Sequence, residues 1–191
     1  MFPKTVYVIR HTTPLVEPGI CYGQTDLPLA DSFQKEADSI HEKLNGFLPQ
    51  VVISSCLQRC TLLAKKLFNN NSVSTDHRLA ELNFGDWEMK PWSAIDRALM
   101  DKWSTNFYSQ SPPNGETFQH LNNRTIEAWQ QHITNSKSTN IALVTHSGNI
   151  RCLLMHYLQI PHNQVFNLKL TYGAILKIEI NSPIHSTVEL L

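Results

Sequence analysis

Thr5-Val-Tyr-Val-Ile-Arg-His11 is the stretch of sequence on which the fold assignment rests. Its first five residues are β-branched or aromatic, which is typical of a strand, and the strand ends on two polar residues. The same arrangement returns in Val51-Val-Ile-Ser-Ser55 and in Ile141-Ala-Leu-Val-Thr-His-Ser-Gly148. In α/β proteins, ligands bind at the carboxyl ends of the parallel strands. We therefore expect the three polar endings to meet at one edge of a sheet.

Helical patterns separate these strands. Apolar residues recur at positions 33, 37, 40, 44 and 48, which is the spacing of one helix face, and Asp31 with Gln34 resembles a capping box at its start. We expect further helices over about 57–68, 92–103, 115–135 and 149–158. The other strands that we expect are 72–75 and three antiparallel edge strands at 165–170, 174–180 and 186–190.

This alternation predicts the α/β fold class, as a three-layer α/β/α sandwich with a mostly parallel central sheet. The length of 191 residues suits a single domain over residues 1–191. The segment 80–138 lacks strand patterns, so we expect it to form a cap-like helical segment over one end of the sheet. The tryptophans are interpreted as packing residues rather than as a stacking surface: Trp87, Trp92, Trp103 and Trp129.

Composition argues against several classes of partner. Sixteen basic and sixteen acidic side chains give a formal net charge of zero, so we expect no nucleic acid and no anionic membrane as a partner. The longest apolar runs are far shorter than the roughly 20 residues of a membrane span, and no signal-peptide pattern is present, so a cytoplasmic location is expected. The four cysteines contain no CxxC pair and are expected to stay unpaired. The sequence indicates no particular oligomeric state.

The strand endings carry residue types that bind and attack phosphate. Arg10 and His11 follow the first strand, Arg59 lies one turn beyond the second, and His146 follows the strand at 141–144. Guanidinium groups match the oxygens of a phosphate dianion, and a neutral imidazole nitrogen can attack phosphorus. A small-molecule phosphate ester is therefore the expected ligand.

Four segments in this order resemble the histidine phosphatase superfamily, the phosphoglycerate mutase-like enzymes. They are Val8-Ile-Arg-His-Thr12, Ser54-Ser-Cys-Leu-Gln-Arg59, Arg78-Leu-Ala-Glu-Leu-Asn-Phe-Gly85 and Leu143-Val-Thr-His-Ser-Gly148. The resemblance spans residues 5–152. It implies a phosphoglycerate mutase-like sandwich and a reaction that passes through a phosphohistidine.

The resemblance also implies roles for the residues at the strand ends. His11 is expected to be the nucleophile that forms the phosphohistidine. Arg10 and Arg59 are expected to hold the nonbridging oxygens and to offset charge in the transition state. His146 is expected to add a cation or a hydrogen bond to the same oxygens.

Glu81 is the candidate for the acid that protonates the leaving alkoxide and then, as a carboxylate, activates water. Asp86 and Glu88 lie nearby in the sequence and are alternative candidates. Ser147 opens the helix after the second histidine, and the amide groups at that helix N-terminus are expected to face the anion.

Three further residues are candidates for contact with phosphate or substrate. Thr12 stands where most relatives have glycine, and a β-branched residue is poorly suited to a positive φ. Its hydroxyl would lie near the phosphate, although the same change could mark a member that has lost activity. Gln24 and Thr25 lie in the turn-rich loop after the first strand and could equally be exposed turn residues.

Within the superfamily, Gly19-Ile-Cys-Tyr-Gly-Gln-Thr-Asp-Leu-Pro-Leu29 is similar to the α-ribazole phosphatase branch of cobalamin assembly. This resemblance implies a metal-independent phosphomonoesterase that converts α-ribazole 5′-phosphate to α-ribazole, without a cofactor. The alternatives are a phosphoglycerate mutase, a broad-specificity sugar or nucleotide phosphatase, and a catalytically silent phospho-ligand or protein-binding domain.

Overall fold

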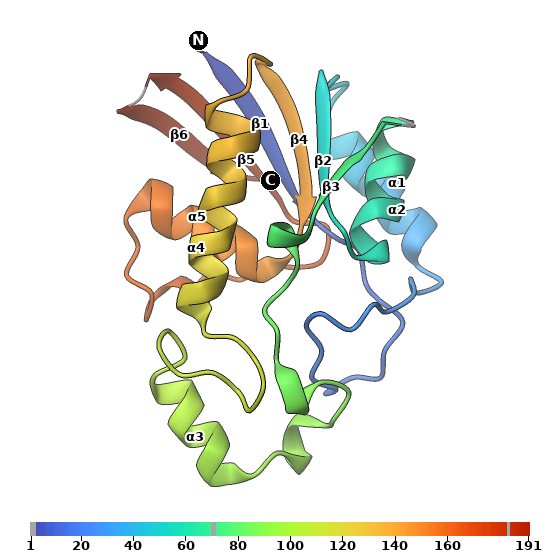
Figure 1. The fold of residues 1–191 in the computed structure, drawn as a ribbon. Coiled ribbons are helices and arrows are strands. Elements are labelled where there is room, and N and C mark those ends of the chain that lie inside the picture. The colour runs from blue at the N-terminus through green and yellow to red at the C-terminus, as the bar shows by residue number, and fades with distance from the viewer. Residues whose placement is uncertain (1–2, 70–71, 183) are drawn as a thin grey trace.

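The computed structural model describes residues 3–69, 72–182 and 184–191. One sheet runs through the molecule, with strand order β3-β2-β4-β1-β5-β6 (Figure 1). The four strands β1 to β4 are mutually parallel, and β5 and β6 are antiparallel to their neighbours. The strand bounds are β1 Lys4–Arg10, β2 Val51–Ser55, β3 Ser74–Asp76, β4 Asn140–Thr145, β5 Ile175–Ser182 and β6 His185–Leu190.

Helices cover both faces of this sheet. The pair α1 (Phe33–Lys43) and α2 (Gln58–Phe68) lies on one face, and the pair α4 (Phe118–Trp129) and α5 (Ser147–Leu158) lies on the other (Figure 1). Successive residues of β1 supply the two cores, because side chains alternate across a strand. Val8 packs with the core under α4 and α5, whereas Ile9 packs with the core under α1 and α2. The fold is therefore the three-layer α/β/α sandwich that the sequence predicts.

Register in the centre of the sheet brings two strand endings together. Arg10 at the end of β1 pairs with Thr145 at the end of β4. The amide of His11 then donates to the Thr145 carbonyl at 3.0 Å. His11 and His146 consequently leave neighbouring strands at the same edge.

One predicted strand is wrong. Residues 165–170 contain a 3₁₀ turn, Val165–Asn167, instead of an edge strand. The guanidinium of Arg151 donates hydrogen bonds to the carbonyl oxygens of Val165 and Leu168, at 2.5 and 3.1 Å. These carbonyls are therefore bonded to a side chain rather than to a neighbouring strand. The other two edge strands are confirmed as β5 and β6.

Helix boundaries differ from the predicted ones where side chains make local bonds. The capping box at Asp31 and Gln34 does not form: α1 begins at Phe33, and Gln34 instead donates to Asp38 at 2.8 Å. The predicted helix 92–103 is broken into a 3₁₀ turn, Trp92–Ala94, and α3, Arg97–Thr105. In the sequence predicted as helix 115–135, the side chain of Thr117 caps α4, and a π turn at Gln130–Thr134 ends it.

Segment 80–138 is divided between two places. Its last helix, α4, belongs to the layer beside α5, whereas α3 lies beyond the carboxyl ends of the strands (Figure 1). None of the nine residues of α3 is buried. No helix within the described ranges is long and apolar enough to cross a membrane.

Candidate active site

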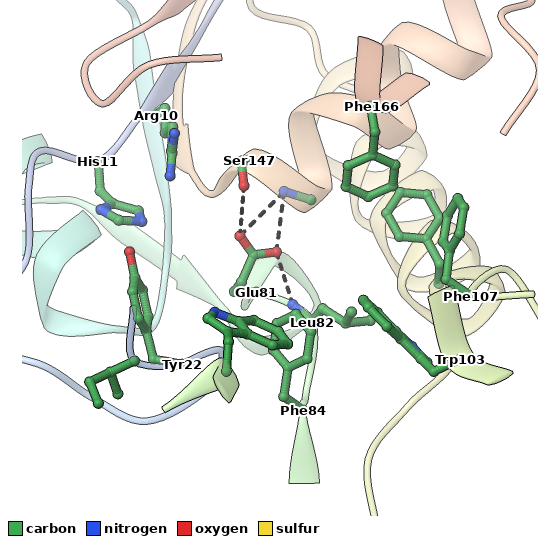
Figure 2. A pocket seen from close by; sticks show the side chains of 14 residues that line it. Arg10, His11, Tyr22, Glu81, Leu82, Phe84, Trp103, Phe107, Ser147 and Phe166 are labelled. Atoms are coloured by element: carbon green, nitrogen blue, oxygen red, sulfur yellow. Dashed lines mark hydrogen bonds between the residues drawn. The ribbon is translucent and has the colours of Figure 1, made fainter. Parts of the chain in front are cut away.

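A cavity of about 210 Å³ opens at the carboxyl ends of β1 and β4. Figure 2 shows polar groups on one side of it and aromatic rings on the other. It is lined by Arg10, His11, Ile20, Tyr22, Glu81, Leu82, Phe84, Trp92, Trp103, Phe107, Phe118, Ser147, Gly148 and Phe166. Four of the residues that the sequence singles out for chemistry therefore share one cavity: Arg10, His11, Glu81 and Ser147.

His11 is held as a neutral imidazole with one free nitrogen. Its Nδ1 lies 2.7 Å from the carbonyl oxygen of Thr12. A carbonyl only accepts, so Nδ1 carries the proton and Nε2 keeps its lone pair. Burial, followed by the charge of Arg59, lowers the pKa of His11 well below its ordinary value. A buried, neutral imidazole with an unprotonated Nε2 is a nucleophile.

The two arginines are anchored differently. Arg59 is fully buried in the first turn of α2 and donates from both terminal nitrogens, to the carbonyls of Thr25 at 2.9 Å and Gly23 at 2.6 Å. Arg10 donates from one terminal nitrogen to the carbonyl of Leu170 at 2.5 Å. The Nε atoms of both arginines are buried and have no hydrogen-bond partner among the described residues.

His146 lies behind the nucleophile and is fully buried. Its ring centroid is 5.0 Å from that of His11, and its Nε2 lies 2.8 Å from the hydroxyl of Ser55. Burial, followed by the neighbouring His11, lowers the pKa of His146 well below its ordinary value. Of the two expected contributions, a hydrogen bond fits this environment better than a permanent cation.

Glu81 is held against the N-terminus of α5. Its carboxylate accepts from the amide of Gly148 at 3.2 Å and from the hydroxyl of Ser147 at 3.2 Å (Figure 2). The amide of Leu82 adds a third bond at 2.9 Å. A Cβ on Gly148 would lie 2.2 Å from Glu81 Oε1, so only glycine permits this approach. The α5 amide of Gly148 therefore holds the acid.

The neighbouring acids have other surroundings. Asp86 accepts from the exposed amide group of Asn114 at 3.0 Å. The Glu88 carboxylate accepts from the backbone amides of Gln24 and Thr25, at 2.9 and 2.6 Å, and from the Thr25 hydroxyl. Burial acts to raise the pKa of Glu88, but these bonds outweigh it and the net shift is downward. Glu88 is engaged in holding the loop, which leaves Glu81 as the carboxylate in the cavity.

Gln24 and Thr25 do not line the cavity. The side-chain amide of Gln24 donates to the Glu81 carbonyl at 3.1 Å. Both residues thus connect the loop after β1 to the segment that carries the acid. Their polar groups are occupied by the protein itself, which favours a positioning role over direct contact with substrate.

Thr12 is fully buried beside the nucleophile. It is absent from the residues with positive φ, so the position after His11 uses an ordinary backbone conformation and tolerates a β-branched residue. Its hydroxyl has no hydrogen-bond partner among the described residues. Thr12 Oγ1 thus joins the two arginine Nε atoms as a buried polar group with no partner.

The aromatic side of the cavity was not predicted as a site. Trp103 and Trp92 both line it, whereas Trp87 and Trp129 are buried packing residues, as predicted. Trp103 packs edge-on against Phe84, with centroids 5.9 Å apart. Sequence reasoning identified no role for four aromatic residues of the lining: Tyr22, Phe107, Phe118 and Phe166. Tyr22 and Phe84 both lie in quoted family motifs.

Over the described ranges, no group of three or more His, Cys, Asp or Glu side chains is arranged to hold a metal ion. The four cysteines are unpaired thiols. Arg10 lines the cavity, and the charge of Arg59 lies close enough to His11 to lower its pKa.

Comparison with curated proteins finds relatives of similar length. The adenosylcobalamin/alpha-ribazole phosphatase of Escherichia coli (strain K12) is 25% identical over 183 residues, which covers 92% of this chain and 90% of that one. The probable phosphoglycerate mutase GpmB of Proteus mirabilis is 27% identical over 186 residues, covering 93% and 86%.

Solved structures share the fold at similar coverage. A putative alpha-ribazole-5′-P phosphatase from Escherichia coli superposes with a TM-score of 0.86 at 24% identity, over 98% of this chain and 95% of that one. A mycobacterial glucosyl-3-phosphoglycerate phosphatase superposes with a TM-score of 0.83 at 20% identity, over 99% and 98%.

The family model of the histidine phosphatase superfamily (branch 1) matches residues 6–188, which include all four segments quoted from the sequence. The polar strand endings with His11 and His146 lie within this match, and so does Glu81. The chain belongs to branch 1 of the histidine phosphatase superfamily.

Proposed function

We propose that this chain is a phosphomonoesterase that works through a phosphohistidine on His11. One observation carries the proposal: Arg10 Nε, Thr12 Oγ1 and Arg59 Nε are buried donors that lack a partner among the described residues, and they belong to residues around a neutral imidazole. A buried donor without a partner costs about 1–3 kcal/mol, so a ligand with acceptor oxygens for these donors would remove part of that cost. A phosphoryl group has three nonbridging oxygens and supplies such acceptors.

The first step transfers the phosphoryl group to the protein. The lone pair of His11 Nε2 attacks phosphorus, and the P–N bond forms as the ester P–O bond breaks. The carboxyl group of Glu81 gives its proton to the leaving oxygen, which departs as an alcohol. Arg10 and Arg59 face the charge that develops on the nonbridging oxygens.

The second step returns the protein to its starting state. Water attacks phosphorus, and the Glu81 carboxylate takes the proton from the attacking oxygen. The P–N bond breaks, which releases inorganic phosphate and restores neutral His11. In this scheme Ser147 and Gly148 keep Glu81 beside both the leaving and the attacking oxygen.

The leaving group that fits the cavity is aromatic, and α-ribazole 5′-phosphate is the substrate that we propose. The aromatic side of the cavity stacks well with a flat base. Among the lining residues, Arg10 is the one cationic side chain, whereas phosphoglycerate carries a carboxylate that needs a further cation. The relatives named as alpha-ribazole phosphatases support the same choice.

Two further properties belong to this proposal. The positive charge for catalysis comes from Arg10 and Arg59, and we propose that the reaction is metal-independent. Four unpaired thiols are typical of a reducing compartment, which supports a cytoplasmic location.

The decisive experiment is rapid quenching with labelled α-ribazole 5′-phosphate in EDTA. Wild-type protein should carry base-stable, acid-labile label on the peptide that contains His11, and His11→Ala should carry none. Glu81→Gln should slow both formation and loss of the label, by about 10²–10⁴-fold in turnover. His120→Ala, an exposed histidine on α4, is the matched control and should label normally.

Parallel assays separate the alternatives. Isomerisation of 3-phosphoglycerate at a rate above hydrolysis would assign a mutase. Equal kcat/KM for α-ribazole 5′-phosphate and sugar phosphates would assign a broad-specificity phosphatase. Phosphate binding without turnover would assign a silent phospho-ligand domain. Turnover with unlabelled His11 would refute the phosphohistidine mechanism.

A further inference from the structure

Two tyrosines from distant segments meet beside the nucleophile. The hydroxyl oxygens of Tyr22 and Tyr172 lie 2.5 Å apart, although the residues are 150 positions apart in the sequence. Tyr22 lies in the loop after β1 and lines the cavity beside His11 (Figure 2). Tyr172 lies just before β5, with its ring centroid 5.7 Å from that of His11. The pair therefore connects two irregular segments next to the reacting nitrogen.

Each tyrosine ring also lies against one of the phosphate arginines. The guanidinium carbon of Arg10 is 4.1 Å from the Tyr172 ring centroid, and that of Arg59 is 5.6 Å from the Tyr22 ring centroid. Both distances are within the range of cation–π contact. The rings thus flank the two guanidinium groups, and the hydroxyl bond ties the rings together.

The Tyr172 side of this arrangement is fixed through its backbone. The amide of Gly173 donates to the His11 carbonyl at 3.2 Å, and Gly173 has a φ of +70°. The Arg10 guanidinium bonds to the carbonyl of Leu170 in the same segment. Tyr172 consequently cannot move without disturbing contacts of both Arg10 and His11.

We infer that Tyr22 and Tyr172 form an aromatic clasp that positions the guanidinium groups of Arg10 and Arg59 for the phosphoryl oxygens. The inference rests on the proposed function and adds two positioning residues to it. The terminal nitrogens of Arg59 already donate to the carbonyls of Gly23 and Thr25. The direction in which its Nε–H points therefore depends on the orientation of the guanidinium plane. The Tyr22 ring of the clasp lies against one face of the Arg59 guanidinium and limits its rotation.

The hydroxyl pair can also donate one further hydrogen bond. Two hydroxyls share one hydrogen bond, which leaves the accepting hydroxyl free to donate elsewhere. Burial, with the bond to Tyr172, raises the pKa of Tyr22, so the Tyr22 hydroxyl stays protonated at neutral pH. A phosphoryl oxygen beside His11 is an acceptor for that second proton.

The test separates ring from hydroxyl. Tyr172→Leu removes both, and Tyr172→Phe keeps the ring over Arg10. We expect Tyr172→Leu to lower kcat/KM for p-nitrophenyl phosphate and to raise the inhibition constant of inorganic phosphate, each about tenfold, as the loss of a partly buried cation–π contact allows. Tyr172→Phe should restore most of the loss. The fold-change should be the same with α-ribazole 5′-phosphate, because the clasp acts on the phosphoryl end.

A double variant tests the hydroxyl bond. If the two hydroxyls act through each other, Tyr22→Phe combined with Tyr172→Phe should lose no more than the worse single variant. Additive losses would overturn the clasp. Tyr7→Leu is the control: Tyr7 packs on Phe47, with centroids 4.2 Å apart in the core under α1 and α2, and should leave phosphate inhibition unchanged.

Failure of the inference is distinct from failure of the proposed function. If the wild-type protein hydrolyses phosphate esters and Tyr172→Leu leaves the inhibition constant of inorganic phosphate unchanged, the clasp alone is overturned. Wild-type protein that neither hydrolyses the esters nor binds inorganic phosphate would overturn both. A loss in Tyr172→Leu that appears with one ester and not the other would place Tyr172 at the leaving group and would also overturn the clasp.

Discussion

Around His11 the cavity is lined by side chains from β1 and from the start of α5, backed by buried Arg59 and His146, whereas beyond Glu81 it is lined by aromatic rings. The polar half is held by bonds to backbone groups, such as those from Arg59 to Gly23 and Thr25. The aromatic half includes Trp92 and Trp103, from a 3₁₀ turn and from α3, a helix with no buried residue. The side chains of the polar half are thus held more firmly by the surrounding structure than those of the aromatic half.

This difference indicates that the two halves of the cavity have different functions. Groups that stabilise a transition state need fixed positions, and those here sit on strand ends and helix starts. Groups that recognise a leaving group contribute through contact area, which tolerates adjustment. Variants in the polar half should therefore affect every substrate, and variants in the aromatic half should affect only substrates with a large leaving group.

The largest effect is expected for Arg59→Lys. Lysine keeps the charge but cannot make the two bonds to the loop carbonyls and also present Nε, so both loop and phosphate lose their donor. We expect kcat/KM to fall about 10³-fold for all substrates, at the upper end for loss of one transition-state donor. Steady-state assays with α-ribazole 5′-phosphate and p-nitrophenyl phosphate provide the measurement.

Arg97→Lys is the matched control, because Arg97 forms an exposed i,i+4 pair with Asp101 on α3. It should behave as wild type. Near-wild-type kcat/KM in Arg59→Lys would show that Arg59 does not contribute to the polar half of the cavity.

The next largest effect is expected for Gly148→Ala. The added Cβ would lie 2.2 Å from Glu81 Oε1 and 2.7 Å from Leu121 Cδ2, so the carboxylate must shift. A displacement of about 1 Å costs roughly 10²-fold in rate, and we expect this loss in kcat for all substrates. Ser147→Ala removes one donor to the same carboxylate without adding bulk, so its loss should be clearly smaller. Equal losses in the two variants would show that steric displacement is not the cause.

The polar half could be predicted from sequence because its parts are local. Each strand is apolar and ends in polar residues, and parallel strands bring their carboxyl ends to one edge. Arg10, His11 and His146 follow from this rule alone. The register of β1 against β4 then places the two histidines side by side. The family resemblance supplied the roles.

The aromatic half could not be predicted in the same way. Its rings come from segments without periodicity, and a tryptophan that packs in a core looks the same in sequence as one that lines a cavity. Tyr172 has no local signal, since its role depends on a contact with Tyr22 across 150 positions. The predicted strand at 165–170 fails for a related reason: its carbonyls bond to the side chain of Arg151, which alternation of apolar residues does not reveal.

A smaller and more selective effect is expected for Trp103→Ala. The loss of its ring from the apolar wall should lower kcat/KM for α-ribazole 5′-phosphate about tenfold, the low end for a change in an apolar pocket. Glycerol phosphate, which has a small leaving group, should be hydrolysed as by wild type. Lys102→Ala, exposed on the same helix, is the control. An equal loss on both substrates would contradict the division between the halves.

The last prediction concerns the stability of the fold. Burial, followed by neighbouring charge, lowers the pKa of His11 and His146 below the ordinary histidine value of 6.5. Below pH 6.5 the unfolded chain therefore binds protons that the folded chain does not. The free energy of unfolding should consequently fall as pH decreases from 6.5, by up to about 1.4 kcal/mol per pH unit for each histidine. Urea unfolding between pH 5.5 and 7.5 measures this slope. His11→Asn should reduce this slope by the contribution of one histidine, and His120→Ala should preserve it, because His120 is exposed. A flat profile in the wild type would show that the two histidines accept protons in the folded state, and His11 would then lose its lone pair in the same range.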